Sequence, residues 1–391
     1  MNWTVLAQQL LDDSAKEGFA GYDPFDGLNS AVFDALPKAK NTGLGLLWIQ
    51  FCKISPVNLR RLLLVPKARN PKGVALFISG LLQDYQRTQD ARFLKQAQEL
   101  GDWLLTQQCD KGVWKHPCWG YHFDWKARAF FVPKGKPNVI TTVYVSRALY
   151  ELGVLAQRED MRLAALASAD FMVEHLATKL DGREFFAYIP GETAFVHNAS
   201  LWAAAWVAFA AKQTNNPSHQ NLALRVARQS VGEQRPDGSW VYGARKHHQF
   251  VDGFHTGYNL EALHEIRNAL GVSEFDAAIA SGLAYYKAHF FEADGAAKYY
   301  NNNRYPLDMH SVAQAVFTLL RVGGEPDDYR LAEKTLQWSM NTLYLPKQQR
   351  FAYQITPLYT NKINYVRWTQ AWAYFALAFY NRYKATTDAK N

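Results

Sequence analysis

Apolar residues recur along most of the chain at spacings of three and four, which is the pattern of a helix with one buried face. Some of these segments also carry charges on the opposite face, as outer helices do: about 91–108, 160–179, 217–234, 273–292 and 327–344. The segments that alternate with them are apolar on almost every side: about 72–89, 138–156, 198–213, 253–269, 308–322 and 363–384. Helices that are apolar all round are buried. The sequence therefore predicts an inner layer of six helices and an outer layer of five.

The N-terminal part supplies the helix that the outer layer lacks. A helix near 3–16 is the sixth outer member, and residues 1–70 form an N-terminal segment that closes the ring. Loops from an outer to an inner helix are long and the return loops are short, so the long loops gather on one face. No segment keeps the alternation of a strand, so strands should be short and lie in the loops. We predict an all-α fold, an (α/α)6 toroid that takes up residues 1–391 as a single domain.

The long loops share a tight turn followed by an aromatic residue. The pattern appears as Lys111-Gly112-Val113-Trp114, as Asp181-Gly182-Arg183-Glu184-Phe185 and as Asp237-Gly238-Ser239-Trp240. Glycine ends the outer helix because it adopts a positive φ without strain, and the aromatic ring packs back over the helix pair. We interpret these corners as structural.

Composition narrows the class of protein. Hydrophobic residues make up 48% and charged residues 20%, so a large core is expected. The net charge of +8 fits an acidic glycan as well as an ordinary surface, and no motif of a nucleic-acid-binding protein is present. The three cysteines are too few and too scattered for a disulfide framework, so free thiols are expected. Neither a signal peptide nor an apolar run long enough for a membrane span is found, so we predict a cytoplasmic protein.

Two corners match a family pattern. Gln108 to Trp114 and Gln234 to Trp240 fit the Gln-x3-Gly-x-Trp pattern of terpenoid cyclases, whose toroid the prenyltransferase β subunits share. Six-hairpin glycosidases, unsaturated-uronide hydrolases and toroid polysaccharide lyases use similar corners. The chain lacks an Asp-x-Asp-Asp motif and the zinc ligands of the prenyltransferases, so terpenoid chemistry is the least favoured reading.

The chain also resembles toroid proteins of bacterial exopolysaccharide and O-antigen biosynthesis clusters. The stretches that carry this resemblance are Tyr22 to Ser30, Trp119 to Trp125 with Arg128, and Asp252 to Asn259. The resemblance implies a role in bacterial polysaccharide metabolism or biosynthesis and does not specify a reaction.

Asparagine or aspartate lies at or beside the start of each inner helix: Asn70, Asn138, Asn198, Asp252, Asp308 and Asn364. N-capping alone accounts for one such residue per helix. The two aspartates also have polar neighbours. His255, Tyr258 and Asn259 follow the first, while Arg304 precedes and His310 follows the second.

These neighbours support a hydrolytic site as the leading hypothesis. Asp252 and Asp308 begin consecutive inner helices, whose axes should be ~8–10 Å apart. Two such carboxylates can reach the ~6.5–9.5 Å separation of an inverting glycoside hydrolase. We predict Asp252, Asp308 and His255 as catalytic residues, with Asp124 as an alternative acid in a loop that also carries Tyr121, His122 and Arg128.

Two other readings stay open. In a polysaccharide lyase, His255 or Tyr258 is the base, and Arg128, Asn138 and Asn198 neutralise a uronate carboxylate. In a non-catalytic glycan-binding assembly protein, the same residues only bind. All readings share an oligosaccharide or polysaccharide partner, acidic in the lyase case. The histidines show no metal-ligand spacing, so neither a metal nor another cofactor is predicted. The sequence leaves the oligomeric state open.

Overall fold

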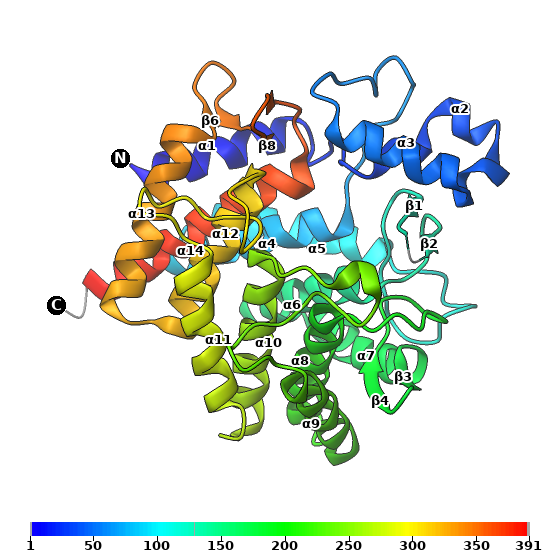
Figure 1. The fold of residues 1–391 in the computed structure, drawn as a ribbon, viewed down its shortest axis with the longest axis vertical. Helices are drawn as coiled ribbons and strands as arrows, with labels where there is room; N and C mark the ends of the chain where they lie inside the picture. The colour runs from blue at the N-terminus through cyan, green and yellow to red at the C-terminus, as the bar shows by residue number, and fades with distance from the viewer. Residues whose placement is uncertain (1, 129, 389–391) are drawn as a thin grey trace.

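The computed structural model describes residues 2–128 and 130–388, and helices dominate it (Figure 1). The inner layer consists of α4 (Pro71–Thr88), α6 (Val139–Leu155), α8 (His197–Gln213), α10 (Gly253–Leu270), α12 (Met309–Thr318) and α14 (Ala371–Asp388). The outer layer consists of α1 (Trp3–Lys16), α5 (Ala91–Thr106), α7 (Glu159–His175), α9 (Pro217–Gly232), α11 (Asp276–His289) and α13 (Pro326–Thr342). Both layers follow the sequence-based prediction.

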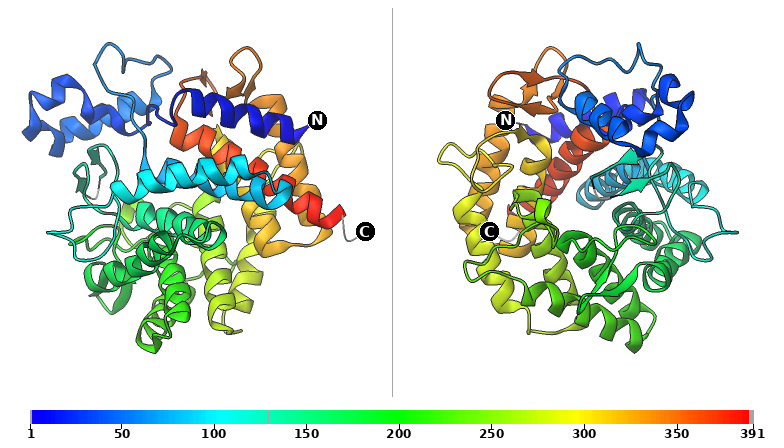
Figure 2. Two further views of the ribbon diagram at one scale, coloured as in Figure 1. Left: turned by 180° about the vertical axis from the view of Figure 1, so that it is seen from behind. Right: turned by 45° about the vertical axis from the view of Figure 1, so that its right-hand side comes forward.

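The inner helices form a closed ring. Each packs against the next in chain order, and α14 packs against α4. The N-terminal helix α1 lies along α14, beside the last hairpin, as Figure 2 shows in blue and red. Burial separates the layers, because α8 is buried on nearly every side whereas α9 is buried along one face only. This contrast follows from the sequence, since a helix that is apolar all round must be enclosed.

The strands are short and lie in the long loops, as predicted. Three antiparallel pairs are β1 (Trp125–Lys126) with β2 (Phe131–Val132), β3 (Ala177–Leu180) with β4 (Arg183–Phe186), and β6 (Tyr344–Leu345) with β7 (Arg350–Phe351). A further sheet has the order β5 (Leu307–Asp308), β8 (Gln354–Ile355) and β9 (Thr360–Asn361). These short strands lie at the end of the ring where the inner helices begin.

Residues 17–70 form the longest of these loops and contain α2 (Ala31–Asp34) and α3 (Gly43–Ile54). Two buried ion pairs anchor the loop. Arg367 Nη2 donates to Asp23 Oδ1 at 2.8 Å, and Arg60 Nε donates to Asp26 Oδ1 at 2.6 Å. Because Arg367 lies at the start of the last inner hairpin helix, the first of these pairs joins the N-terminal segment to the C-terminal end of the ring.

Two stretches of the inner layer are π-helical. Leu319–Gly323 continues α12, and Val366–Gln370 leads into α14. The second stretch positions Arg367 and Trp368 at the mouth of the ring. π-Turns often occur at functional sites because they redirect side chains within a helix.

The corner at Asp237–Trp240 shows why the turn motif recurs. Gly238 has a φ of 90°, and a Cβ there would lie 2.5 Å from the Ser281 carbonyl oxygen. The Trp240 ring is buried, and its Nε1 donates to the Ser230 carbonyl at 2.9 Å. The corner thus ties an outer helix to its neighbour and is structural in nature.

We expect Trp240→Ala to lower the free energy of unfolding by about 3–5 kcal/mol, because it opens a large cavity in the core. The equivalent Trp114 is only half-buried, so Trp114→Ala should cost clearly less. Urea denaturation of both variants measures the difference. Equal losses would show that the corner stabilises the fold by something other than burial of this ring.

Four of the six predicted helix-start residues are N-caps. Asn70, Asn138, Asp252 and Asp308 each accept a backbone hydrogen bond from the first turn. Asn198 instead lies within the first turn of α8, whose N-cap is Val196. Asn364 precedes the π-helical stretch, which has no side-chain cap. Asn198 is therefore available for another role.

Candidate functional site

A cavity of about 330 Å³ opens at the end of the ring where the inner helices begin. Its floor comes from α4, α8, α10 and α12, and its walls come from the long loops. Six of the predicted site residues line it: Tyr121, Asn198, Asp252, His255, Tyr258 and His310. These six residues therefore lie together at the long-loop end of the ring.

Asp252 and His255 form a hydrogen-bonded pair at the start of α10. Asp252 Oδ1 accepts from the His255 backbone N–H at 2.8 Å, and Oδ2 lies 2.6 Å from His255 Nδ1. The carboxylate is buried, while about a fifth of the His255 side chain is exposed. A carboxylate on Nδ1 fixes the proton there and leaves Nε2 as the basic nitrogen. Asp252 thus orients the His255 imidazole in addition to capping α10.

Tyr258 and His310 form a second pair. The Tyr258 hydroxyl lies 2.6 Å from His310 Nε2, on neighbouring inner helices. Burial holds the pKa of Tyr258 well above its usual value, so the phenol keeps its proton. Burial, together with the nearby charges of Lys72, His255 and Arg367, holds the pKa of His310 well below 6.5, so His310 is neutral. The rings of His255 and Tyr258 are 6.0 Å apart, which places two proton-carrying groups beside the same space.

Two cationic residues reach the floor of the cavity. Lys72 Nζ lies 4.3 Å from the Tyr144 ring centre and 5.3 Å from that of Trp372. Burial and the nearby Arg367 hold the pKa of Lys72 well below 10.5. Arg367 keeps its charge through its ion pair with Asp23. The cavity therefore presents a fixed positive charge beside an amine that burial drives toward the neutral form.

Aromatic rings cover the walls. Tyr121 stacks on Phe123 at 5.1 Å, and its hydroxyl lies 2.8 Å from that of Tyr188. Trp368 stands edge-on to His310 at 4.8 Å, and Tyr242 lies 4.6 Å from His255. Flat aromatic faces with a few polar groups at the floor are typical of small-molecule sites.

The remaining predicted residues lie outside this cavity. Asp308 is buried behind its wall, where Oδ1 accepts from Ser311 N at 2.9 Å and Oδ2 from Trp368 Nε1 at 3.5 Å. The pair Asp252 and Asp308 is thus not assembled on one cavity surface. Arg128 lines an adjoining hollow of about 320 Å³.

The other five predicted residues have local partners. Asp124 pairs with Lys40 at 2.7 Å, and His122 Nδ1 lies 3.1 Å from Asn70 Nδ2. Asn138 caps α6, and Arg304 pairs with Asp294 at 3.0 Å. Asn259 is buried within α10 and does not line the cavity. Burial also lowers the pKa of His122 to about 4, which keeps that imidazole neutral.

Sequence reasoning missed Lys72 and Arg367. Lys72 is the single charged residue between positions 70 and 83, and Arg367 is the single one between positions 363 and 381. A single charge in such a segment is a usable signal, because burying a charge is costly unless it has a partner or a function.

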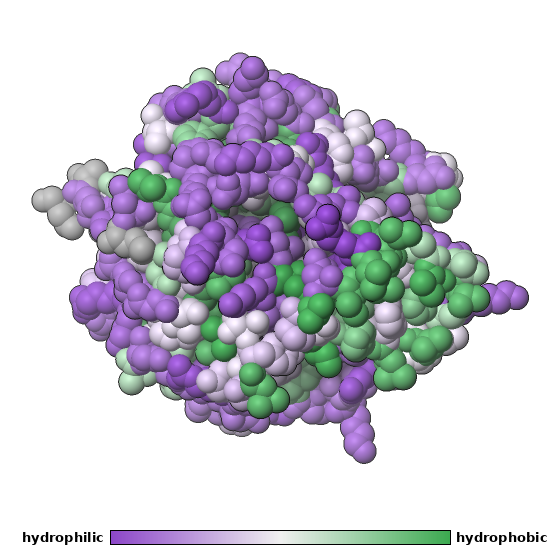
Figure 3. Space-filling view, turned by 90° about the horizontal axis from the view of Figure 1, so that it is seen from above, coloured by the Kyte–Doolittle hydropathy of each residue, from purple (hydrophilic) through white to green (hydrophobic). Residues whose placement is uncertain are grey.

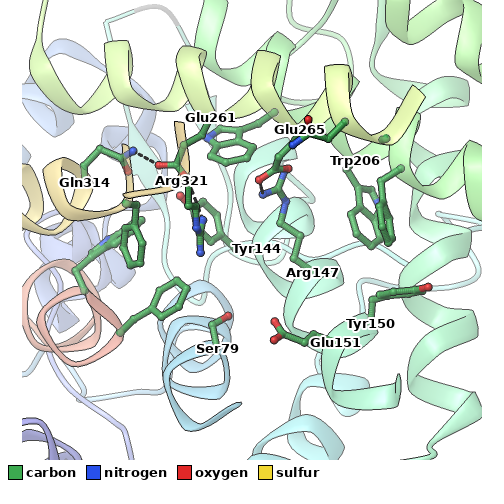
Figure 4. Close-up of a pocket in the computed structure, with 17 residues that line it drawn as sticks. Ser79, Tyr144, Arg147, Tyr150, Glu151, Trp206, Glu261, Glu265, Gln314 and Arg321 are labelled. Carbon is green, nitrogen blue, oxygen red and sulfur yellow. Dashed lines mark hydrogen bonds and ion pairs between the residues drawn. The ribbon is translucent and has the colours of Figure 1, made fainter. Parts of the chain in front are cut away.

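A second cavity, of about 530 Å³, lies at the other end of the inner helices (Figure 4). Most of its charged side chains form ion pairs with one another. Arg147 Nη1 donates to Glu265 at 2.6 Å, and Arg321 Nη1 donates to Glu261 at 2.8 Å, with Gln314 on the same carboxylate. It holds no imidazole, whereas the cavity at the mouth holds two. We therefore take the cavity at the mouth as the candidate site.

Among residues 2–128 and 130–388, no cluster of three or more His, Cys, Asp or Glu side chains is arranged to hold a metal ion. Within the same residues, no helix is long and apolar enough to cross a membrane. Cys52, Cys109 and Cys118 are free.

The fold has clear relatives among solved structures. A cellobiose 2-epimerase from Bacillus thermoamylovorans aligns with a TM-score of 0.65 and 10% identity over 80% of this chain and 88% of its own. An unsaturated glucuronyl hydrolase specific for heparin aligns with a TM-score of 0.61 and 14% identity over 83% and 89%. A GH76 α-mannanase from Bacteroides thetaiotaomicron gives 0.62 and 11% over 82% and 88%.

The fold is an (α/α)6 toroid. No protein-family model and no curated protein sequence matches the chain. At identities of 10–14%, the alignments establish the architecture of the toroid but not its reaction. The reaction has to be argued from the geometry of the site.

Proposed function

We propose that this toroid is a carbohydrate-active enzyme that moves a proton at a sugar carbon, as a sugar epimerase does. The carrying observation is the Asp252–His255 pair, whose imidazole Nε2 is left as a base at the cavity. Aromatic walls suit the apolar faces of a sugar ring, and the polar floor suits its hydroxyl groups.

The proposed reaction begins when His255 Nε2 removes a proton from the carbon next to a carbonyl or carboxyl group. The C–H electron pair moves toward that group, and negative charge develops on its oxygen. The positive charge of Arg367 stabilises this oxygen, and the amine of Lys72 can donate a hydrogen bond to it, since both residues line the cavity. Tyr258, kept protonated and held by His310, is placed to return a proton to the carbon. Return on the opposite face yields the epimer. His255 then releases its proton to solvent and Tyr258 takes one up, which restores both groups.

Neighbouring structures support this choice without deciding it. Three proteins with the same fold are named as sugar epimerases, and removal and return of a proton is one route to inversion at a carbon that bears hydrogen. A lyase begins with the same step but then expels the group on the next carbon. The positive charge of Arg367 suits the uronate that a lyase needs, so elimination is the second candidate.

Two-carboxylate hydrolysis fits the cavity less well. Both Asp252 oxygens are engaged by His255, and Asp308 does not line the cavity. Inverting hydrolysis needs both groups beside the substrate. The proposed substrate is a glycan of bacterial exopolysaccharide or O-antigen biosynthesis.

The reaction class can be tested with reducing disaccharides and uronate-containing oligosaccharides. We expect a change in the configuration of the reducing sugar, seen by chromatography and NMR, without new reducing ends. A rise in absorbance at the unsaturated-uronide band would instead identify a lyase. New reducing ends without that rise in absorbance would identify a hydrolase, and saturable binding without any product would identify a binding protein. Each of the last two results would contradict the proposal.

A further inference from the structure

An exposed apolar surface lies beside the mouth, on α3 and the chain on either side of it. Of the fifteen large apolar side chains that the described residues expose, nine fall between positions 32 and 64. In Figure 3 apolar side chains gather on the right of the view, on the side where α2 and α3 lie in Figure 1. Scattered apolar residues are ordinary on a surface, but a concentrated group marks an interaction site.

Helix α3 explains the concentration, because it is apolar on two opposite faces. Gly45, Ile49 and Cys52 are buried against the rest of the loop. On the other side Leu44, Leu47, Phe51 and Ile54 follow the helical spacing and face solvent, with Leu47 69% and Phe51 45% exposed. Such a helix is normally enclosed by protein or lipid.

The same segment carries half of the net positive charge of the chain. Residues 32–64 contain five Lys or Arg and one acidic residue, a net charge of +4, against +8 for the whole sequence. Lys40 and Arg60 are ion-paired. Lys38 and Arg61 are exposed and form no ion pair within the described residues.

We propose that this surface, residues 32–64, binds an anionic membrane from one side. Leu47, Phe51 and their neighbours enter the boundary between headgroups and acyl chains, while Lys38 and Arg61 contact the lipid phosphates. Apolar side chains combined with basic ones are the composition of an interfacial helix, and each basic residue near an anionic surface adds to the attraction. A second copy of the chain is a poorer occupant, because a symmetric dimer would place the same positive segment against itself.

The surface lies next to the candidate site. Lys53 of α3 lines the cavity at the mouth, and Gln50 lines the adjoining hollow. Binding through α3 therefore brings the mouth close to the lipid surface. This inference rests on the surface alone and does not depend on the proposed reaction.

Vesicle co-sedimentation tests the proposal with the full-length protein. One set of vesicles contains phosphatidylcholine alone, and the other contains phosphatidylglycerol and phosphatidylcholine in equal parts. We expect binding to the anionic vesicles that weakens as salt is raised. The double variant Leu47→Glu/Phe51→Glu should bind them about a hundredfold more weakly.

A matched control changes exposed apolar residues elsewhere. Val154 and Leu163 are 52% and 54% exposed at the other end of the ring, so Val154→Glu/Leu163→Glu should bind like the wild type. Both double variants should keep the wild-type circular dichroism spectrum, since the changed side chains face solvent.

Absence of wild-type binding to the anionic vesicles at low salt would overturn the proposal, as would equal binding by Leu47→Glu/Phe51→Glu. Sedimentation velocity without vesicles measures whether a second copy of the chain occupies the surface instead. A dimer that this variant dissolves would assign the surface to a second copy and also overturn the proposal.

Discussion

Asp252→Asn should reduce turnover of the sugar substrate by about 10³–10⁴-fold, the scale seen when a carboxylate that orients a catalytic imidazole is replaced by its amide. Asparagine still caps α10, because its Oδ1 can accept from the His255 backbone N–H. Its amide N–H, however, faces His255 Nδ1 and favours the tautomer with the proton on Nε2. The base is then lost while the helix and the cavity persist. Steady-state kinetics and circular dichroism together measure the two effects.

Asp308→Asn is the matched control. Asp308 caps the next inner helix by the same geometry, but it lies outside the cavity. We expect its turnover to stay within about threefold of the wild type, since asparagine caps the helix equally well and the other contact that changes is the long one, 3.5 Å, with Trp368 Nε1. If Asp308→Asn were as damaging as Asp252→Asn, the two-carboxylate hydrolysis would be favoured and the proton-transfer proposal would fail.

Lys72→Met should lose activity and gain stability. Lys72 is a hydrogen-bond donor at the floor of a water-poor cavity, and its loss weakens stabilisation of the developing charge. We expect this to lower turnover by about 10²-fold. The folded state holds the pKa of Lys72 well below 10.5, so the unfolded chain binds this proton more readily. In the wild type, the contribution of Lys72 to stability is therefore most favourable above pH 10.5. This contribution falls as the pH drops toward the folded pKa.

The variant removes this loss, so it should be more stable than the wild type at pH 7. The gap should narrow as the pH rises toward 10.5. Urea denaturation at several pH values measures the gap. A variant that is less stable than the wild type at pH 7 would show that Lys72 holds the fold together and is not a strained functional group.

The architecture could be predicted because its causes are local. Helix α8 is apolar on every side and α9 on one, and this difference alone assigns them to different layers. Gly238 and Trp240 mark a corner by their own conformational and packing preferences. Helix α1 packs along α14 as the sixth outer helix, which the number of inner segments already required.

The site could be predicted only in part, because its chemistry depends on contacts between distant segments. Sequence spacing found Asp252 and His255, which are three residues apart on one helix turn. It could not show that Asp308 is buried behind Trp368 and does not line the cavity. Nor could it show that Arg367 reaches Asp23 across 344 positions, or that Lys72 lies beneath the aromatic rings. Only the folded structure shows which distant residues are paired in this way.

Exchange of a carbon-bound hydrogen with solvent tests the central claim most directly. The enzyme is incubated in D₂O with reducing disaccharides and uronate-containing oligosaccharides, and ¹H NMR follows the proton on the carbon next to the carbonyl or carboxyl group. The account predicts that the wild type replaces this proton with deuterium while Asp252→Asn does not. Conversion of a sugar by the wild type with no deuterium at that carbon would contradict it.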